Sequence, residues 1–348
     1  MELINKLLRS DDEAAITGAL DQLFANQNPA YERLIDLVEA VAESSHTETP
    51  QPLDCVLIAI PVLAWSRYQI ASGRIPAEQL ADLRVHVQAH LLAADTRLAL
   101  ADFLFSPDQL PQSYVETLEL TNRLVAPALH GKDIKVDADK LPETVNFLSD
   151  TRYLLGVAAA TRGAPLFRWQ ENDSTREEAL RHWREQGGEV LRRLLPACAI
   201  EFVPAGAYHA AVRDADRASR PYSVQAGVAF LQTVLNQPAN AFRAIIGAYY
   251  EQQIEEYRIG FTFADAPDVV HGVVWPLLDS EEESSDVVAQ IETVLRECGI
   301  TNILVIDQRL PLEFCDDCGA PLYPNPEGEA MHAEIPEGTE SPGPHNLH

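Results

Sequence analysis

The sequence lacks the short motifs by which many enzyme families are identified. No GxxxxGK[ST] phosphate loop is present, no GxGxxG follows an apolar run, and neither a GxSxG elbow nor an HExxH pair occurs. Each of these motifs places particular atoms around a phosphate, a nucleophile or a metal. Their absence therefore disfavours the common nucleotide-binding, serine-hydrolase and zincin chemistries.

Positive charge is also scarce. The chain has 53 acidic residues against 26 lysines and arginines, which gives a net charge of -27 at pH 7, and no lysine or arginine follows Arg309. A surface this acidic repels phosphate groups, so we expect neither nucleic-acid binding nor attachment to an anionic membrane. A protein partner or a homo-oligomer is compatible with the charge.

Long apolar runs and an even set of cysteines are missing as well. The longest apolar run, Cys55 to Trp65, is too short to cross a bilayer, and the N-terminus has no apolar core of the signal-peptide kind. The five cysteines are odd in number and scattered, which argues against a disulfide framework. We therefore expect a cytoplasmic protein.

The chain does contain a pattern of strand, helix and strand that occurs three times. In each copy a helical segment is followed within a few residues by an apolar run with the composition of a strand. This pattern predicts an α/β or α+β fold with two or three pseudo-repeats, in which the helices pack on the closing strands. The helices are predicted at Ala77–Leu92, Ser174–Leu195 and Ser285–Cys298, and the closing strands at Leu98–Phe105, Ala199–Val203 and Asn302–Ile306.

Local signals refine these copies. Leu83, Val87 and Leu91 mark the buried face of the first helix. In the second copy, Pro165–Gln170 is predicted to be a strand, and Ser174 with Glu177 is predicted to form a capping box. In the third copy Gly299 ends the helix, and Val305→Asp is expected to unfold the unit because the charge would be buried without a partner.

Shifts in composition divide the chain into five parts. Residues 1–50 are predicted to form helices and to end in a polar linker at Ser44–Pro52. Residues 51–196 and 197–312 form a first and a second α/β region. Residues 313–335 contain a turn with two cysteines, and the acidic residues 336–348 are expected to be disordered.

Three polar groups are weak candidates for a ligand site, because each also fits a solvated or interfacial surface. The first is a row of side chains spaced four apart on the first helix, which a metal could use. The other two each follow a predicted strand, at the edge where α/β proteins often bind ligands. The groups are Asp82, His86 and His90; Trp65, Ser66, Arg67 and Tyr68; and His209, Arg213, Asp214, Asp216 and Arg217.

The sharpest chemical signal is Cys315-x-x-Cys318-Gly319. Two thiolates at this spacing, with a glycine that permits a tight turn, form the knuckle that chelates zinc in ribbon-type sites. His332 is the best-placed third ligand, and a carboxylate, a water or a distant residue would be the fourth. The alternative is a degenerate knuckle that binds nothing, whereas a redox CxxC pair is disfavoured because no helix is predicted to begin at Cys315.

Three segments carry a family resemblance: Ile60–Gly73, Leu83–Leu100 and Leu312–Glu329, the last containing CDDCGAPLYPNPEGE. They resemble an uncharacterised family of β-proteobacterial proteins that is known as a domain of unknown function. The likeness spans Ile60 to Glu334 and is most specific at the Cys turn. It implies a bacterial cytosolic protein and lends no catalytic residues.

Three classes of function fit these observations. The first is a non-catalytic binding or scaffold protein with a structural zinc site at Cys315, Cys318 and His332. The second is an enzyme whose site lies at strand C-terminal ends, near Trp65–Tyr68 and His209–Arg217. The third is an acidic mimic of nucleic acid that occupies the groove of a basic partner, which predicts a steeply salt-dependent association.

Overall fold

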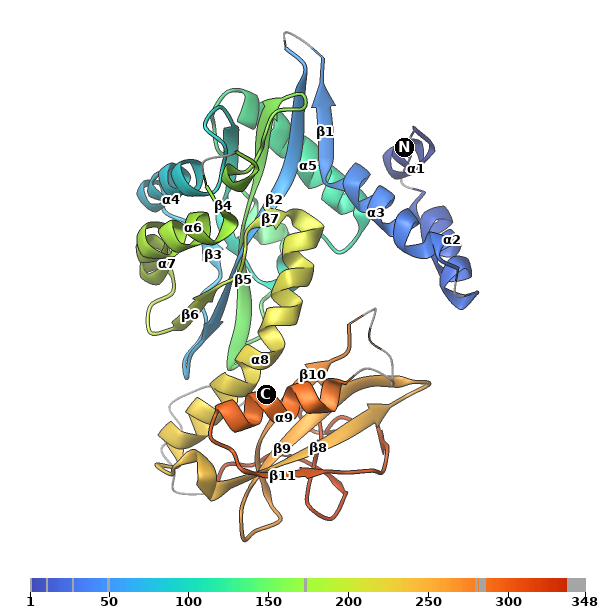
Figure 1. Cartoon of the computed structure of the whole chain (residues 1–348), viewed down its shortest axis with the longest axis vertical. Helices are drawn as coiled ribbons and strands as arrows, with labels where there is room; N and C mark the ends of the chain where they lie inside the picture. The colour runs from blue at the N-terminus through green and yellow to red at the C-terminus, as the bar shows by residue number, and fades with distance from the viewer. Residues whose placement is uncertain are drawn as a thin grey trace.

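Two β-sheets, stacked along the long axis of the molecule and bridged by one helix, organise the chain in the computed structural model (Figure 1). The structure describes residues 2–10, 12–26, 28–48, 51–171, 174–278, 281 and 286–336. Disorder is expected for residues 336–348, and of this segment the described part of the chain includes only Pro336. Helices and mixed sheets together make the fold α+β, with a helical N-terminus as predicted.

The N-terminal helices α1 (Glu2–Arg9), α2 (Glu13–Ala25) and α3 (Ala30–Ala42) form a small bundle beside the first sheet. Their apolar faces pack together and against Leu118 of α5 (Tyr114–Leu129). The prediction of a polar linker at Ser44–Pro52 is wrong for its first half, because Ser44–Thr47 forms strand β1. This polar segment is a strand because its backbone pairs with a strand far more apolar than itself, Leu53–Trp65.

The centre of the first sheet is an antiparallel pair of long strands, β2 (Leu53–Trp65) and β5 (Ser149–Thr161). The two pair over their whole length, from Leu53 opposite Thr161 to Trp65 opposite Ser149. Nearly all of their residues are buried, since helices cover both faces of the sheet, and this explains the nearly continuous apolar sequence.

The first two pseudo-repeats interlock in this sheet. Strand β4 (Arg97–Phe105), which closes the first copy, pairs with β5, the first strand of the second copy. Strand β6 (Ala199–Phe202), which closes the second copy, pairs with β2, the first strand of the first copy. The short strands β3 (Gly73–Arg74) and β7 (Gly206–Ala207) pair with β4 and β2. The first sheet therefore extends beyond residue 196, where the sequence pattern divides the two α/β regions.

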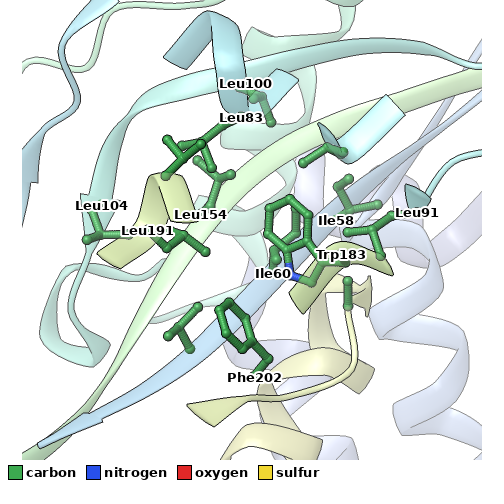
Figure 2. Packing of buried hydrophobic residues seen from close by; sticks show 14 of the residues in the cluster. Ile58, Ile60, Leu83, Leu91, Leu100, Leu104, Leu154, Trp183, Leu191 and Phe202 are labelled. Carbon is green, nitrogen blue, oxygen red and sulfur yellow. The ribbon is translucent and has the colours of Figure 1, made fainter. Parts of the chain in front are cut away.

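Helices of the two copies also occupy matching places. Helix α4 (Ala77–His90) lies with α6 (Arg176–His182) and α7 (Gly188–Leu194) on one face, while α5 and the first half of α8 (Tyr208–Val234) cover the other. The predicted burial of Leu83, Val87 and Leu91 is confirmed. Figure 2 shows the Trp183 ring, from the π-helical turn between α6 and α7, among the aliphatic side chains of this core.

The third copy builds the second sheet, in the order β10 (Val269–Pro276), β9 (Ile254–Phe263), β8 (Phe242–Tyr250) and β11 (Asn302–Val305). The first three strands are antiparallel, and β11 joins β8 in parallel. Helix α9 (Val287–Glu297) and the second half of α8 cover one face through Val224, Val228, Leu231, Val287, Ile291 and Leu295. Gly299, at a φ of 86°, follows the end of α9 as predicted.

Helix α8 joins the two sheets because its two halves belong to different cores. Residues up to Tyr222 pack on the first sheet, and those from Val224 onward pack on the second. Near the junction, the buried Arg220 forms a bidentate ion pair with Glu281 and lies over the ring of Trp275 on β10. Among the described helices, none is long and apolar enough to cross a membrane.

Two local predictions in the second copy are wrong. Pro165–Gln170 is not a strand, because the Gln170 side chain accepts hydrogen bonds from the N–H groups of Leu166 and Phe167 and curls the segment into a turn. The helix cap lies one residue later than predicted, with Thr175 and Glu178 forming the capping box. Both errors arise where a polar side chain bonds to nearby backbone, which apolar periodicity does not report.

The expected burial of Asn302–Ile306 is also wrong. Strand β11 lies at the edge of the second sheet with β8 as its paired neighbour, and the side chains of Leu304 and Val305 are 38% and 37% exposed. An apolar run specifies a strand, but its position in the sheet depends on pairing between distant segments. Because residue 305 is partly exposed, an aspartate there would not be buried without a partner, and the argument that Val305→Asp unfolds the third unit no longer holds.

Candidate metal centre

The Cys turn is a compact loop that presents two sulfur atoms. The Cys315 carbonyl accepts a hydrogen bond from Gly319 N–H at 2.8 Å, and Cys315 N–H donates to the Ala320 carbonyl at 2.7 Å. Gly319 has a φ of 72°, a conformation that glycine adopts without strain, and an isolated bridge between Phe314 and Pro321 closes the loop. The glycine of the motif therefore has the role that the spacing predicted.

A small hairpin brings the third donor back to this turn. Strands β13 (Tyr323–Pro324) and β14 (Ala330–Met331) pair antiparallel, and the Asn325 side chain accepts hydrogen bonds from Glu327 N–H and Glu329 N–H in the connecting loop. His332 follows β14 directly. The hairpin thus explains how a histidine fourteen residues after Cys318 returns to the two cysteines.

The structure brings together the three predicted ligands. The donor atoms of Cys315, Cys318 and His332 all lie within 4.8 Å of one another, and Cys318 Sγ is 3.3 Å from His332 Nε2. A tetrahedral zinc ion with Zn–S near 2.3 Å and Zn–N near 2.0 Å would hold such atoms about 3.5 Å apart. Within the described residues, no other group of three or more His, Cys, Asp or Glu donors is close enough to share one metal.

The electrostatics of the turn favour a metal-binding thiolate. Hydrogen bonds from the backbone N–H groups of Asp317 and Cys318 lower the pKa of Cys315, although the Asp317 carboxylate opposes this effect. Burial instead raises the pKa of Cys198 and Cys298, and raises that of Cys55 to about 11. Since the thiolate is the form that binds metals, Cys315 is better suited to the task than these three.

Glu334 lies near His332 on the side of the ring opposite to Cys318. Its carboxylate oxygen lies 3.6 Å from His332 Nδ1, while Nε2 of the same ring faces Cys318. This separation is longer than a hydrogen bond and the Glu334 side chain is 83% exposed, so the carboxylate would have to move closer to orient a metal-binding imidazole. Sequence reasoning missed Glu334, and its spacing of two residues from His332 is the only signal that could have suggested it.

One buried arginine ties the Cys turn to the second sheet. Arg258 on β9 is fully buried and donates through Nη1 to the carbonyls of Glu313, at 2.7 Å, and Leu322, at 2.8 Å, which lie on either side of the turn. Its guanidinium lies over the rings of Tyr249 and Phe314, and Glu256 balances its charge. Charge-assisted hydrogen bonds to both flanks fix the turn against the face that α8 and α9 leave uncovered.

A row of glycines lets the hairpin lie directly on this face. Gly247, Gly260 and Gly272 come from three adjacent strands, and a Cβ on any of them would crowd Tyr323 or Pro324. The distances would be 3.3 Å at Gly247, 2.2 Å at Gly260 and 2.3 Å at Gly272. The Tyr323 ring is fully buried beneath the hairpin. A glycine inside each of three apolar strands was a visible signal of close backbone approach that the sequence pattern alone did not connect to the Cys turn.

The polar row on α4 does not form a comparable site. The rings of His86 and His90 stack at 5.8 Å, His90 stacks on His182 of α6 at 6.0 Å, and His90 Nε2 lies 3.2 Å from Gln186 Oε1. Asp82 pairs with Arg193 of α7. These contacts join neighbouring helices, in agreement with the interfacial interpretation.

The two polar groups predicted at strand C-terminal ends lie apart. Strand β7 pairs with Ile58 and Ala59, which places the start of α8, and therefore His209, beside the middle of β2. Trp65 ends that strand seven positions later, or about 23 Å along it, and Ser66 bonds to the Ala197 carbonyl. His209 does follow the end of a strand, because β7 ends at Ala207 and α8 begins at Tyr208, but this strand end is far from the end of β2 at Trp65.

His209 and Arg213 instead contact the N-terminal bundle. The N–H of His209 donates to Glu43, and Arg213 pairs with Glu39 of α3. Burial raises the pKa of Glu43 to about 7 and lowers that of His209 to about 4. These groups fasten α3 to α8 through a polar interface.

A small cavity lies between the two sheets. It has a volume of about 170 Å³ and is lined by the start of β5, by α8 and by His271–Val274 of β10. The hydroxyls of Ser149 and Ser223 in its wall bond to each other at 2.9 Å. Its donor groups are fewer and less specific than those at the Cys turn.

Comparison with known proteins gives one result. A family model described as Protein of unknown function (DUF2863) matches residues 1–346. Neither curated proteins nor solved structures give a significant match.

Proposed function

Because the chain belongs to the DUF2863 family of proteins of unknown function, we propose a role from its own site: a non-catalytic binding or scaffold protein in which Cys315, Cys318 and His332 hold one structural zinc ion. The observation that supports this most directly is the convergence of the three donors from two separate segments. Two thiolates and an imidazole are the donor set that selects zinc among the abundant divalent cations. A reducing cytoplasm would keep these thiols available.

The ion would fasten the C-terminal segment to the second sheet. The Cys turn and the residues after β14 are held separately, the former by Arg258 and the latter by Glu334 N–H, which donates to the Val269 carbonyl at 2.9 Å. A zinc ion bound by Cys315, Cys318 and His332 would link the Cys turn to the residues after β14, so that the two attachments would act together. It would also offset the two thiolates, which lie in a turn that already contains Asp316 and Asp317.

A binding role fits the distribution of polar groups better than an active site does. The residues suggested as an alternative catalytic site, Trp65–Tyr68 and His209–Arg217, lie in different places and are engaged in contacts between helices and strands. The donor cluster, by contrast, lies at the surface, on a segment attached to an otherwise uncovered sheet face.

Elemental analysis of protein purified without added metal tests the proposal. About one zinc per chain is expected, and the Cys315→Ser, Cys318→Ser double variant should lose it. Cys298→Ser is the matched control, because Cys298 lies at the end of α9 outside the donor cluster. Zinc well below one per chain, unchanged in the double variant, would leave the turn without a metal role.

A further inference from the structure

The donor cluster supplies three ligands, whereas zinc in proteins is almost always four-coordinate. Among the residues the structure describes, no fourth Cys, His, Asp or Glu donor joins Cys315, Cys318 and His332. Glu334 is the nearest carboxylate contact of His332, but it lies at Nδ1, on the far side of the ring from Cys318. Cys318 is exposed, and Cys315 and His332 are half-buried, so the donor cluster as a whole is accessible from solvent.

We infer that this fourth position binds a neutral nitrogen donor, namely the imidazole of a histidine in a basic segment of a protein partner. This inference rests on the proposed zinc site. Three protein ligands and one exchangeable position are the arrangement by which zinc accepts a ligand from outside. The charge around the position decides which ligand it accepts.

Charge around the site disfavours anionic ligands. Two thiolates neutralise the zinc ion, so the centre contributes no net positive charge. Asp316, Asp317 and Glu313 are exposed beside it, and no lysine or arginine occurs in the chain after Arg309. Arg258, the cation beneath the turn, is buried and paired with Glu256. A carboxylate or phosphate would therefore approach against a negative field, whereas a neutral imidazole would not, and flanking lysines or arginines would be attracted.

Two partly exposed apolar residues adjoin the ligands in the sequence. Phe314 precedes Cys315 and is 49% exposed, and Met331 precedes His332 and is 39% exposed. The Phe314 ring lies against the guanidinium of Arg258, and Met331 belongs to β14, where successive side chains point to opposite faces. A histidine-bearing basic segment therefore matches the site in coordination chemistry and in charge.

Cobalt substitution of the full-length protein tests this inference, because the visible spectrum of tetrahedral Co²⁺ changes when its fourth ligand changes. Titration with imidazole is expected to shift the spectrum to saturation, while acetate at the same concentrations should leave it unchanged. In the Asp316→Asn, Asp317→Asn variant, acetate should begin to shift the spectrum at concentrations about threefold or more below those at which it first acts on the wild type, with little change for imidazole. Both residues are exposed, so the substitutions remove charge without disturbing the core.

The outcomes are distinct. Failure to take up cobalt or zinc at all would overturn the proposed metal site itself. Stoichiometric cobalt with a spectrum that does not respond to imidazole would overturn the open position alone. The open position would also be overturned if imidazole changed the spectrum only in the His345→Ala, His348→Ala variant. One of those two histidines, which lie outside the described residues, would then be the fourth ligand of the wild-type protein. Equal binding of acetate and imidazole would overturn the charge selection.

Discussion

Replacing Gly260 by alanine is expected to loosen the attachment of the C-terminal hairpin to the second sheet while the sheet itself stays folded. An added Cβ would lie 2.2 Å from the Pro324 carbonyl oxygen and 3.2 Å from the carbonyl carbon. Carbon and oxygen atoms that are not bonded keep about 3.3 Å apart, so β13 would have to retreat by about 1 Å. The clash involves backbone, which cannot turn aside as a flexible side chain could.

The cost of this clash decides which part of the structure gives way. Overpacking of a tight site typically costs about 1–3 kcal/mol. Detaching the hairpin mainly exposes Tyr323, whose burial contributes about 2–3 kcal/mol, together with the two hydrogen bonds from Arg258. The other face of the sheet is held by the whole core shared with α8 and α9. Hydrogen bonds to a charged group contribute about 1.5–3 kcal/mol each, so detachment would cost about 5–9 kcal/mol in all, and the clash lowers this cost by about 1–3 kcal/mol. The hairpin of the variant should therefore stay mainly attached but open about 5- to 150-fold more often, whereas unfolding of the sheet should remain rare.

Hydrogen exchange combined with a chelator competition checks this expectation. Amides after about Leu310 should exchange faster in Gly260→Ala, amides of β8 and β9 should not, and zinc affinity should fall because His332 is carried by the same hairpin. Gly18→Ala is the matched control: its Cβ meets nothing within 4 Å, and the change in helix α2 should stabilise by about 0.5–1 kcal/mol. Unchanged exchange and unchanged zinc affinity in Gly260→Ala would refute the close packing of the hairpin on the sheet.

Three further outcomes are expected. Val305→Asp should destabilise by only about 1–2 kcal/mol, because Val305 is 37% exposed on an edge strand. Ile246→Asp on the neighbouring β8, where the side chain is fully buried, should unfold the second sheet. Equal effects in a urea titration would contradict the edge position. Burial, together with Glu39, raises the pKa of Glu43 from 4.5 to about 7, although His209 N–H and Arg213 oppose this shift. The contribution of Glu43 to stability is therefore full below pH 4.5 and is lost as the pH rises through 7. Relative to the wild type, Glu43→Gln should gain stability across that interval, and parallel pH profiles of the two proteins would disprove this. Chelation of zinc should speed amide exchange only after about Leu310, and faster exchange in β2 or β5 would show that the metal supports more than the C-terminal segment.

Elements that depend on local sequence could be predicted, because their signals are contained in one window. The length and apolar content of Cys55–Trp65 predict a buried strand, which the structure extends to Leu53–Trp65. The glycine at 299 predicts a helix end, and CxxCG predicts a tight turn with two sulfurs. His332 could be predicted as a ligand from local sequence as well. The stretch between it and Cys318 is short and contains prolines and glycines, so it can return as a hairpin.

Features that depend on pairing between distant segments could not be predicted in this way. Nothing in Ala199–Phe202 indicates that it pairs with β2 of the first copy, and nothing in Asn302–Val305 indicates that it lies at an edge. The same limit applies to Arg258 and Gly260, which lie on a strand more than fifty residues before the turn they support. In these places tertiary contacts decide the role of a residue, and a single sequence does not record them.

The division of α8 between two cores has a consequence during protein synthesis. Once the chain has been made as far as Ala207, every strand of the first sheet is available, and the first half of α8 can dock on it. The second half then carries Val224, Val228 and Leu231 with no sheet to cover them until β8 to β11 have followed. A nascent chain paused between Val234 and Val305 therefore presents an apolar helix face to other nascent chains and to chaperones, and this interval of translation is when the protein is most prone to aggregate.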